Sequence, residues 1–541
     1  MKEIYLTILI LVLSLPVFSQ EAGHVDVSFA SNGIEIEPAN IITDEVEFAL
    51  DGNGKLIVGL NNILATDTTM VVMRFNQDGT NDLTFNGTSA SIVDLGEDTY
   101  YLKDLEALPD EKILLCGHNK NQKNNFVARL LPNGAMDNTF GTNGYVILDI
   151  SADSNEIALN IEPYLNGSYL ISGHACEKDS TVGYDNFIVK ILGNGFIDNT
   201  FNNGEPKYYH HGLNDNFNTN LIVQLDGKII LSGSYLYNGT EYIYLERINS
   251  SGLTEPTISF PTGSEIGYYN FNNDANTLLK DVIEKETGGF FLAGNAIKTG
   301  GSDYDVFILN ANNDGALNRD FGLENPYWAT TLHDFQYNTA DDEIRKIIEL
   351  KNGELVLAGF TSSLATSEPD AAILGLSPDG SINTDFGESF GETVVDIQGV
   401  IDDVDGAYYG REDRLLNAVY DASLNRIYVA GKTWNPDQNK YDLFLAAFHA
   451  EDVVSSVNNI KIEVNVRVYP NPAKNHIQVV LDKGLTNTGI ISIFDSKGSQ
   501  ILEKAILEKN TEVNLSHLPK GLYLISVNTN SRVYSKTIIK Q

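Results

Sequence analysis

Several kinds of residue and segment are scarce in this 541-residue chain, and each scarcity excludes a class of protein. Only two cysteines occur, Cys116 and Cys176, which excludes a disulfide-rich scaffold. We expect two buried or half-buried thiols, with a disulfide between them as the alternative. No long stretch shows a clean helical period of apolar residues. Hydrophobic residues still make up 42% of the chain, so extensive disorder is excluded as well.

Positive charge is scarce in all but the last part of the chain. Residues 20–459 contain 24 Lys and Arg against 66 Asp and Glu, whereas residues 460–541 contain 11 against 6. An acidic body repels phosphate backbones, so the composition argues against a nucleic-acid partner. Cations or a basic protein surface suit this charge better as partners, but solubility outside the cell is the explanation that we favour.

Long apolar runs are also rare. One run extends from Ile4 to Phe18, follows Lys2 and is interrupted by Pro16. It is too short for a stable transmembrane helix and has the order of a secretory signal peptide, which we assign to residues 1–19. Neither cysteine lies close enough to it for lipid attachment. We therefore expect an exported protein with no transmembrane segment in the mature chain.

A repeat of about sixty residues runs through the middle of the chain. Each unit contains an apolar strand that ends on a glycine, then another strand, a turn and a phenylalanine. Asn-Gly and Asp-Gly pairs between the strands indicate tight hairpins, and four antiparallel strands a unit are typical of a propeller blade. The repeat glycines are Gly59, Gly117, Gly173, Gly233, Gly294, Gly359 and Gly431, and the repeat phenylalanines are Phe29, Phe85, Phe140, Phe201, Phe260, Phe321 and Phe386.

The count of these half-units predicts a closed ring. The seventh glycine half runs into Glu451 without a phenylalanine motif, whereas Asp26 to Phe29, with Gly33 beyond, supplies such a motif near the N-terminus. Ile34–Glu37 would then be the last strand of the seventh unit, which removes exposed edge strands. We predict an all-β chain: a seven-bladed β-propeller over residues 20–452, closed by N-terminal strand complementation, and a small C-terminal Ig-like β-sandwich.

The motif Asp/Asn-x-Thr-Phe-Gly after an Asp/Asn-Gly turn, as between Gly134 and Gly141, resembles the delta-60 repeat family of bacterial β-propellers. The resemblance covers about residues 24–450. The unit at Ser251–Phe260 departs from the pattern, because two extra residues separate its glycine from its phenylalanine. The resemblance implies a propeller and says little about activity.

A different pattern follows the predicted linker at residues 453–465. Short strand runs alternate with turns, which favours a small sandwich. Residues 466–541 closely resemble the type A C-terminal sorting domain of Bacteroidetes type IX secretion. The resemblance implies recognition by the secretion machinery, passage across the outer membrane, removal of the domain, and attachment to the cell surface or release. It is carried by Tyr469, Pro470, Asn471 and Pro472, by Asp495 and Gly498, by Gly521 and Tyr523, and by Lys536 and Lys540.

Three short motifs resemble catalytic or binding signatures, but the repeat explains each of them better. Gly387–Gly391 fits Gly-x-Ser-x-Gly but directly follows a repeat phenylalanine, where a turn is expected instead of a strand-turn-helix elbow. Gly431–Thr433 would need a glycine at Arg426 to be a phosphate-binding loop. Asn310–Gly315 begins like a calcium loop, yet its twelfth position is Phe321.

The remaining candidates are histidines, acids and aromatic residues. His118 and His174 follow equivalent glycines in neighbouring units, but a metal site needs at least one further ligand. We expect no cofactor, and calcium stays an open alternative. Aromatic residues near loops could stack on sugars or anchor a protein, although blade packing explains each one singly. These further candidates are His210 and His211; Asp402, Asp403 and Asp405; and Tyr208, Tyr209, Tyr268, Tyr269, Trp328, Tyr408, Tyr409 and Trp434.

Two functions fit these patterns. We favour a non-enzymatic secreted or surface propeller that binds a protein or glycan on one loop face, or acts mainly as a scaffold. The alternative is an extracellular glycan hydrolase or lyase with two carboxylates in the propeller channel. Sequence alone selects no catalytic residue among 66 acids, and it leaves the ligand, the binding face and the oligomeric state open.

Overall fold

The structure of the protein is a computed structural model, in which the chain forms two units, a body within residues 18–453 and a tail within residues 454–541. The predicted signal peptide and linker lie outside the described residues. The structure describes residues 21–540 except 65–66, 97, 151–154, 176–183, 210–215, 238–239, 255–266, 270–276, 298–302, 323–329, 334, 336–340, 363–367, 389–390, 396, 398–399, 402–407, 410–411, 452–465, 470–472, 482–488, 495–499, 507–509 and 530–531.

Much of the body consists of four-stranded antiparallel sheets in which consecutive strands lie side by side. Their second and third strands are buried on both faces, so they appear in the sequence as continuous apolar runs such as Ile113–Cys116. The sheets comprise β5 (Tyr100–Ala107), β6 (Ile113–Asn119), β7 (Asn125–Leu130) and β8 (Tyr145–Leu148); β9 (Glu156–Tyr164), β10 (Ser168–Ala175), β11 (Asp185–Ile191) and β12 (Lys207–Tyr209); β13 (Asn216–Val223), β14 (Ile229–Tyr237), β15 (Thr240–Ile248) and β16 (Gly267–Tyr269); β17 (Thr277–Glu284), β18 (Phe290–Ile297), β19 (Tyr304–Ala311) and β20 (Thr330–His333); and β21 (Asp342–Glu349), β22 (Leu355–Ser362), β23 (Pro369–Leu376) and β24 (Glu392–Val395).

The long strand β1 (Ile34–Leu50) connects the first and last parts of the body. Its first half pairs with β29 (Lys440–His449) and its second half with β2 (Leu56–Leu64), within a seven-stranded sheet of order β27-β28-β29-β1-β2-β3-β4. The other members are β3 (Asp67–Phe75), β4 (Ala90–Val93), β27 (Asp413–Asp421) and β28 (Arg426–Asn435). The body also contains β25 (Val400–Ile401), β26 (Tyr408–Tyr409) and the short 3-10 helices η1 (Leu165–Gly167) and η2 (Asn202–Gly204).

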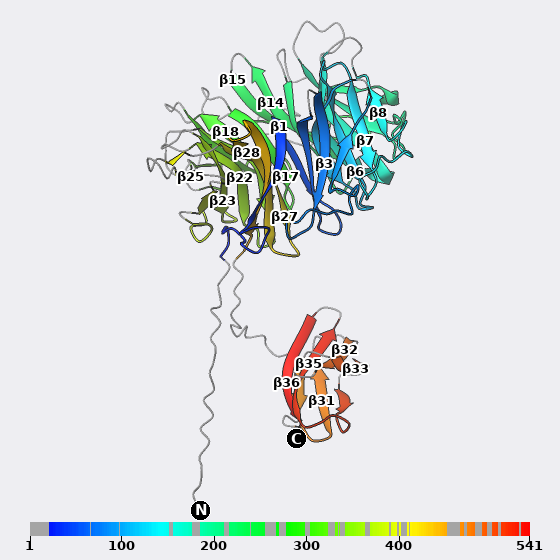
Figure 1. The fold of residues 1–541 in the computed structure, drawn as a ribbon, viewed down its shortest axis with the longest axis vertical. Coiled ribbons are helices and arrows are strands. Elements are labelled where there is room, and N and C mark those ends of the chain that lie inside the picture. The colour runs from blue at the N-terminus through cyan, green and yellow to red at the C-terminus, as the bar shows by residue number, and fades with distance from the viewer. Residues whose placement is uncertain are drawn as a thin grey trace, which may run out of the picture. The chain divides into compact units, whose positions relative to one another are not determined.

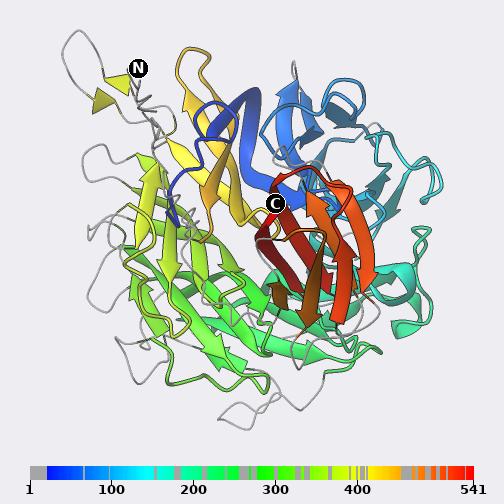
Figure 2. The same ribbon diagram turned by 90° about the horizontal axis from the view of Figure 1, so that it is seen from below.

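The sheets follow one another around a common centre, as the colours of the body show in Figures 1 and 2. We call β1, β5, β9, β13, β17, β21 and β27 the inner strands; they contact one another in this order, and β27 also contacts β1. Lys280 meets Glu343, and the next residue, Asp281, meets Ile347, so neighbouring inner strands run in the same direction. They therefore begin on one face of the body, the strand-start face, and the opposite face is the turn face.

Each repeat glycine lies opposite an irregularity in the inner strand. Facing Gly117, β5 carries one extra residue between Leu102 and Asp104, and a side-chain carbon on Gly117 would lie 1.9 Å from the Tyr101 carbonyl oxygen. Such a bulge brings the backbone so close to the second strand that only glycine fits there. A similar one-residue bulge stands opposite Gly173, Gly233, Gly294, Gly359 and Gly431, and a larger register shift lies beside Gly59.

The repeat phenylalanines fill the core between neighbouring sheets. Phe85 is fully buried, and the Arg74 guanidinium lies 4.8 Å from its ring centroid. Arg74 Nε donates to Asp82 at 2.8 Å, and the same carboxylate accepts the Thr84 hydroxyl at 2.6 Å. The Asp-x-Thr-Phe motif thus satisfies its own polar groups over the buried ring. Phe29, Phe140, Phe201, Phe321 and Phe386 are also buried, and Phe260 lies outside the described residues.

A backbone hydrogen bond after five of these six buried rings, those other than Phe201, connects one sheet to the next. The Asn86 N–H donates to the Asn133 carbonyl at 2.7 Å, and the neighbouring Gly134, at φ +85°, packs against the Phe85 ring. This φ and the close ring both require glycine at the turn. The same bond joins Ala30 to Asp78, Gly141 to Asn194, Gly322 to Asp379 and Gly387 to Ala22.

The N-terminal segment from Ala22 to Gly33 takes part in this series twice. Phe29 packs against Gly79 of the first repeat, and Gly23 packs against Phe386 at the end of the β21–β24 sheet. Within the segment, Asp26 forms an ion pair with Arg426 of β28. It therefore occupies the position that a phenylalanine motif occupies in the other repeats.

The described part of the tail forms two sheets around a shared core. Ile477 and Val479 from one sheet pack with Ile491 and Ile525 from the other, as in a β-sandwich. The first sheet contains β30 (Val466–Tyr469), β31 (His476–Leu481) and β34 (Asn510–Asn514), and the second contains β33 (Gln500–Ile506), β32 (Gly489–Phe494), β35 (Gly521–Thr529) and β36 (Arg532–Lys540).

The bulge contact predicts a large cost for a single methyl group at a repeat glycine. Gly117→Ala should lower the free energy of unfolding by about 3 kcal/mol, because the new carbon collides with the inner-strand backbone. Gly52→Ala is the control, since nothing lies within 4 Å of the added carbon there, and its effect should stay within about 0.5 kcal/mol. Denaturant unfolding of both variants measures the difference; equal stabilities would contradict the assigned bulge.

Candidate functional site

Polar side chains converge where the inner strands surround the centre of the body. The residue after each one-residue bulge is polar, and Lys346 on β21 interacts electrostatically with Asp281 on β17 and with carboxylates on β1 and β5. Side chains from several sheets therefore approach one another there. We call Glu47, Asp104, Glu106, Glu162, Asp281 and Lys346 the axial cluster.

Two acids of the axial cluster hold neighbouring sheets together. Asp104 accepts the Ile161 N–H of β9 at 2.7 Å, and Asp281 accepts the Ile347 N–H of β21 at 2.9 Å. Asn417 makes a related contact, because its amide donates to the Val46 carbonyl of β1 at 3.2 Å. These side chains thus serve the packing of the inner strands.

Three glutamates of the axial cluster have raised pKa values. Burial, followed by the Asp104 charge, raises the pKa of Glu47 to about 8 and that of Glu162 to about 8. Burial and the Glu162 charge raise the pKa of Glu106 well above its usual range. Asp104 is raised less, to a pKa of about 6, because burial is opposed by its hydrogen bond from Ile161. The cluster therefore retains protons near neutral pH.

Ion pairs surround the axis at the strand-start face. Lys280 of β17 lies 2.9 Å from Glu343 of β21, and Arg345 lies 2.8 Å from the same carboxylate. Arg414 of β27 lies 3.1 Å from Asp44 of β1. Lys103 and Glu45 form another pair between β5 and β1. Basic residues from several sheets are thus paired with acids at this rim.

A pocket of about 350 Å³ opens beside these ion pairs, and we call it the rim pocket. Its walls include Lys280 and Asn295 from the β17–β20 sheet, Glu343 and Phe360 from the β21–β24 sheet, and Arg414 from β27. The Arg414 guanidinium lies 5.3 Å from the Phe360 ring centroid. The pocket therefore combines hydrogen-bond donors, acceptors and an aromatic wall.

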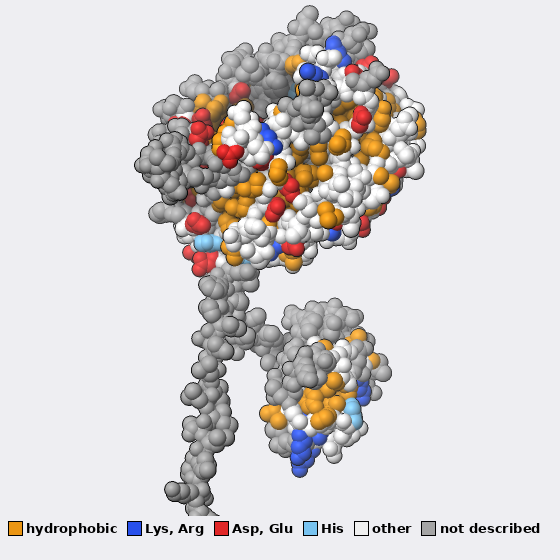
Figure 3. All heavy atoms as spheres, viewed as in Figure 1, with side chains coloured by type: hydrophobic (Ala, Val, Ile, Leu, Met, Phe, Trp, Pro, Cys, Tyr) orange, Lys and Arg blue, Asp and Glu red, His pale blue; other side chains and the backbone are white. Residues whose placement is uncertain are grey.

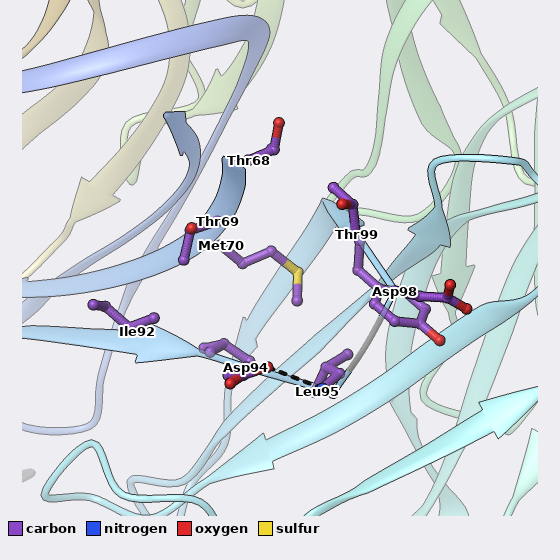
Figure 4. Close-up of a pocket in the computed structure, with 11 residues that line it drawn as sticks. Thr68, Thr69, Met70, Ile92, Asp94, Leu95, Asp98 and Thr99 are labelled. Carbon is purple, nitrogen blue, oxygen red and sulfur yellow. Dashed lines mark hydrogen bonds between the residues drawn. The ribbon is translucent and has the colours of Figure 1, made fainter. Parts of the chain in front are cut away.

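A second pocket, of about 360 Å³, lies between β3 and β4 of the seven-stranded sheet and the start of β5 (Figure 4). Thr68, Thr69 and Met70 line it from β3, and two acids, Asp94 and Asp98, line it from the connection to β5. One Asp94 oxygen already accepts the Gly96 N–H at 2.9 Å. Two carboxylates are too few to dominate a cation site.

The three signature-like motifs lie in ordinary repeat structure. Gly387–Gly391 joins Phe386 to β24, and the chain does not enter a helix there; Ser389 lies outside the described residues. Gly431–Thr433 lies inside β28, where Lys432 pairs with Asp44. Asn310–Gly315 is the end of β19 and a hairpin turn, and Phe321 is buried in the core.

The histidines and cysteines are spread over separate places. His118 and His174 lie at equivalent positions of β6 and β10, where the His118 Nδ1 is 2.8 Å from the Asn119 carbonyl oxygen and the His174 ring packs on Tyr184. Among the described residues, no three His, Cys, Asp or Glu side chains could hold a metal ion. Cys116 is a buried free thiol whose pKa is raised by burial. Cys176, His210, His211, Asp402, Asp403 and Asp405 lie outside the described residues.

The aromatic candidates that the structure describes serve packing. Tyr208 and Tyr209 of β12 donate to the carbonyl oxygens of Ile150 and Gly252, and the Trp434 ring lies 4.9 Å from that of Tyr441. The side chains of Tyr268, Tyr269, Trp328, Tyr408 and Tyr409 lie outside the described residues.

In the tail, Tyr469 is exposed, and the buried Tyr523 donates its hydroxyl to the Pro519 carbonyl at 2.8 Å. Gly521 begins β35 opposite Lys540, and Lys536 pairs through its backbone with Ile525. Pro470, Asn471, Pro472, Asp495 and Gly498 lie outside the described residues.

Comparison with known families agrees with both parts of this description. Residues 467–541 match the secretion system C-terminal sorting domain, and residues 108–140 and 224–257 match a β-propeller domain of unknown function, the delta-60 repeat family. The body thus contains repeats of the delta-60 β-propeller family, and the tail contains a type IX sorting domain. The sorting domain directs export by the type IX secretion machinery to the cell surface or extracellular space. No helix among the described residues is long and apolar enough to cross a membrane.

Solved structures that resemble this propeller protein are diverse, and no curated protein matched its sequence. Polysaccharide lyase Uly1 has a TM-score of 0.39 and 10% identity, over 78% of this chain and 92% of that one. Drosophila Semaphorin 2a has a TM-score of 0.40 and 9% identity, over 97% of this chain and 99% of that one. The β-propeller domain of the Trilobed protease from Pyrococcus furiosus has a TM-score of 0.37 and 8% identity, over 77% of this chain and 99% of that one. At these TM-scores the likenesses carry no argument about activity.

The axial cluster escaped the sequence analysis, although a signal for it exists. A polar residue stands thirteen positions before the repeat glycine in five repeats, as Asp104, Asn160, Asn220, Asp281 and Lys346. In the seventh repeat the interval is fourteen, at Asn417. Aligning the repeats on their glycines would have revealed a column of polar residues at one position of the inner strands.

The raised pKa values predict a propeller that is more stable in mild acid. A carboxyl group whose pKa is higher in the folded state stabilises the fold when it is protonated. For Glu162 this contribution is complete below the unfolded pKa, near 4.5, and is lost as the pH rises through the folded pKa, about 8. The melting temperature should therefore fall between about pH 5 and pH 9. Glu162→Gln should flatten this fall, and the exposed Glu388→Gln should not; identical pH profiles for all three proteins would refute the assignment.

Proposed function

We propose that the mature protein is a seven-bladed β-propeller over residues 20–452, closed by its N-terminal segment after loss of a signal peptide at residues 1–19. A linker at 453–465 then leads to an Ig-like sorting domain at 466–541. The order of the inner-strand contacts, from β1 round to β27 and back to β1, supports the blade number. The double pairing of β1 and the contacts of Phe29 and Gly23 with the first and sixth repeats support the closure.

Closure of the ring predicts that a residue near the N-terminus contributes as much to the stability of the body as its counterpart in a later repeat. Phe29→Ala and Phe85→Ala should each lower the free energy of unfolding by about 3–5 kcal/mol, because both rings support the turn glycine of the next blade. Thermal and denaturant unfolding of the two variants provides the measurement. A Phe29→Ala protein as stable as the parent would show that the segment is a dispensable arm, and deletion of Gly23–Pro38 would then be harmless as well.

The function that the geometry supports best is non-enzymatic binding of a glycan or protein at the strand-start face. The main observation that supports this proposal is the difference between the connections on the two faces. Turns on the turn face share one pair of backbone bonds, as from Leu108 to Lys112 and from Glu111 to Leu108, and the same pair recurs from Asp51, Gln224, Lys285 and Leu350. Connections on the strand-start face differ in length, from 65–66 to 176–184 and 396–412. Variable loops on a rigid scaffold are typical of binding surfaces.

The distribution of charge favours a small binding site over a broad charged binding surface. On the side seen in Figure 3, acidic side chains are scattered over the body instead of forming one patch. At the rim, Lys280, Arg345 and Arg414 are each paired with an acid. Recognition by specific loops and the rim pocket therefore fits better than attraction of a basic protein to the whole body.

A glycan hydrolase or lyase remains the second candidate, because Glu47, Glu106 and Glu162 hold protons as a general acid would. Two observations weigh against it. Asp104 and Asp281 are engaged with the backbone of neighbouring strands, and neither of the two pockets described above is lined by axial glutamates. Absence of polysaccharide turnover by the parent protein would exclude the enzyme; turnover by the parent that Glu106→Gln or Glu162→Gln abolishes would establish it.

The proposed binding face can be tested by blocking each face in turn. A bulky maleimide polymer is attached to Asp98→Cys on the strand-start face or to Asn53→Cys on the turn face, in a protein carrying Cys176→Ser; the buried Cys116 should not react. The probes are envelope polysaccharide and envelope protein fractions of the producing bacterium. Binding should be lost only with the strand-start conjugate. Loss only with the Asn53→Cys conjugate, or with neither, would contradict the proposal.

A further inference from the structure

Building on the proposed binding function, we infer that the rim pocket recognises an uncharged sugar residue of a glycan. The inference concerns the walls of one cavity formed by three inner strands and their neighbours. Its volume of about 350 Å³ falls within the usual range for small-ligand sites, about 300–1,000 Å³. It opens on the strand-start face, among residues at the starts of β17, β21 and β27.

The charges of the pocket disfavour an anionic ligand. Lys280 is held 2.9 Å from Glu343, and Arg414 is held 2.6 Å from Glu412 and 3.1 Å from Asp44. Each cation is therefore already compensated by an acid of the protein itself. An anionic sugar would have to displace one of these acids and to approach a body with 66 Asp and Glu against 24 Lys and Arg.

The hydrogen-bonding groups of the pocket match the hydroxyl groups of a sugar. Each sugar hydroxyl donates one hydrogen bond and accepts others, so it needs acceptors and donors side by side. Lys280 and Arg414 supply donors, and Glu343 supplies an acceptor within the same walls. Ser362, on the wall beyond Phe360, adds a hydroxyl of its own.

Asn295 adds an acceptor that the protein leaves unused. Its side chain lines the pocket and is 2% exposed, and its amide nitrogen donates to the Asp342 carbonyl oxygen at 2.7 Å. Within the described part of the chain, the side-chain oxygen of Asn295 accepts no hydrogen bond. A buried amide oxygen without a donor is unfavourable, so a ligand hydroxyl that reaches it is favoured.

The apolar part of the wall suits the carbon-hydrogen face of a sugar ring. Phe360, Tyr304 and Pro369 lie in the same walls as the charged groups. The Phe360 ring is held in place by two guanidinium groups, 5.7 Å away for Arg345 and 5.3 Å away for Arg414. A fixed aromatic wall beside directed polar groups gives orientation as well as contact area.

The experiment uses the full secreted chain and two sets of probes, neutral oligosaccharides of glucose, xylose and mannose and uronate oligosaccharides of alginate and polygalacturonate. Binding is found on a glycan array and measured by calorimetry. Lys280→Ala and Tyr304→Ala should each weaken the binding of a neutral glycan about tenfold or more. Lys103→Ala is the matched control, because Lys103 occupies the same bulge position in the second blade and also pairs with a glutamate; its affinity should stay within about twofold.

Each outcome decides a separate point. Neutral-glycan binding that Lys280→Ala and Tyr304→Ala leave unchanged, in variants with parental melting temperatures, overturns the pocket assignment. Uronate binding that these substitutions abolish overturns the preference for an uncharged sugar. Absence of any glycan binding overturns the inference while leaving the proposed function intact if the Asp98→Cys conjugate still blocks a protein ligand. Failure of that conjugate to block any ligand defeats the proposed function itself.

Discussion

The contact between a repeat phenylalanine and the turn glycine of the next sheet is the interaction on which the rest of the body depends. Each sheet buries both faces of its middle strands, so it is stable only when neighbours cover them. At Phe85, the ring, its arginine and the Asn86 N–H together fix where the turn of Gly134 lies. Repeating this contact sets the angle between sheets, and the angle sets how many sheets surround the axis.

That arrangement has a consequence at the centre. Inner strands crowd together around the axis, and their bulges direct side chains such as Asp104 and Asp281 toward the backbone of the next strand. The same crowding places Glu47, Glu106 and Glu162 within reach of one another's charge, and burial keeps them protonated. The centre is therefore organised by packing, whereas the rim contains compensated ion pairs and the pocket to which we assign the proposed recognition.

Much of the fold could be predicted from sequence because its determinants are local. The Asp-x-Thr-Phe motif satisfies its polar groups within a few residues, and a turn such as that of Gly134 needs a positive φ wherever it occurs. The pairing of Ile34–Glu37 with β29 spans the length of the body, yet its half-motif at Asp26 to Phe29 is recognisable alone. The tail could also be predicted from its sequence, because its sorting motifs lie close together in the chain and resemble those of a known family.

The sequence by itself therefore determined the repeat, its all-β character, the sorting tail and the route of export. Only the tertiary structure decided which acids meet at the axis and which residues form the rim pocket. Lys280, Glu343 and Arg414 belong to three different repeats, and their proximity follows from the rotation between sheets, which no single repeat encodes. The pKa of Glu162 likewise depends on Asp104 of the preceding blade. Distances and burial between distant segments arise only when the sheets pack together around a common axis.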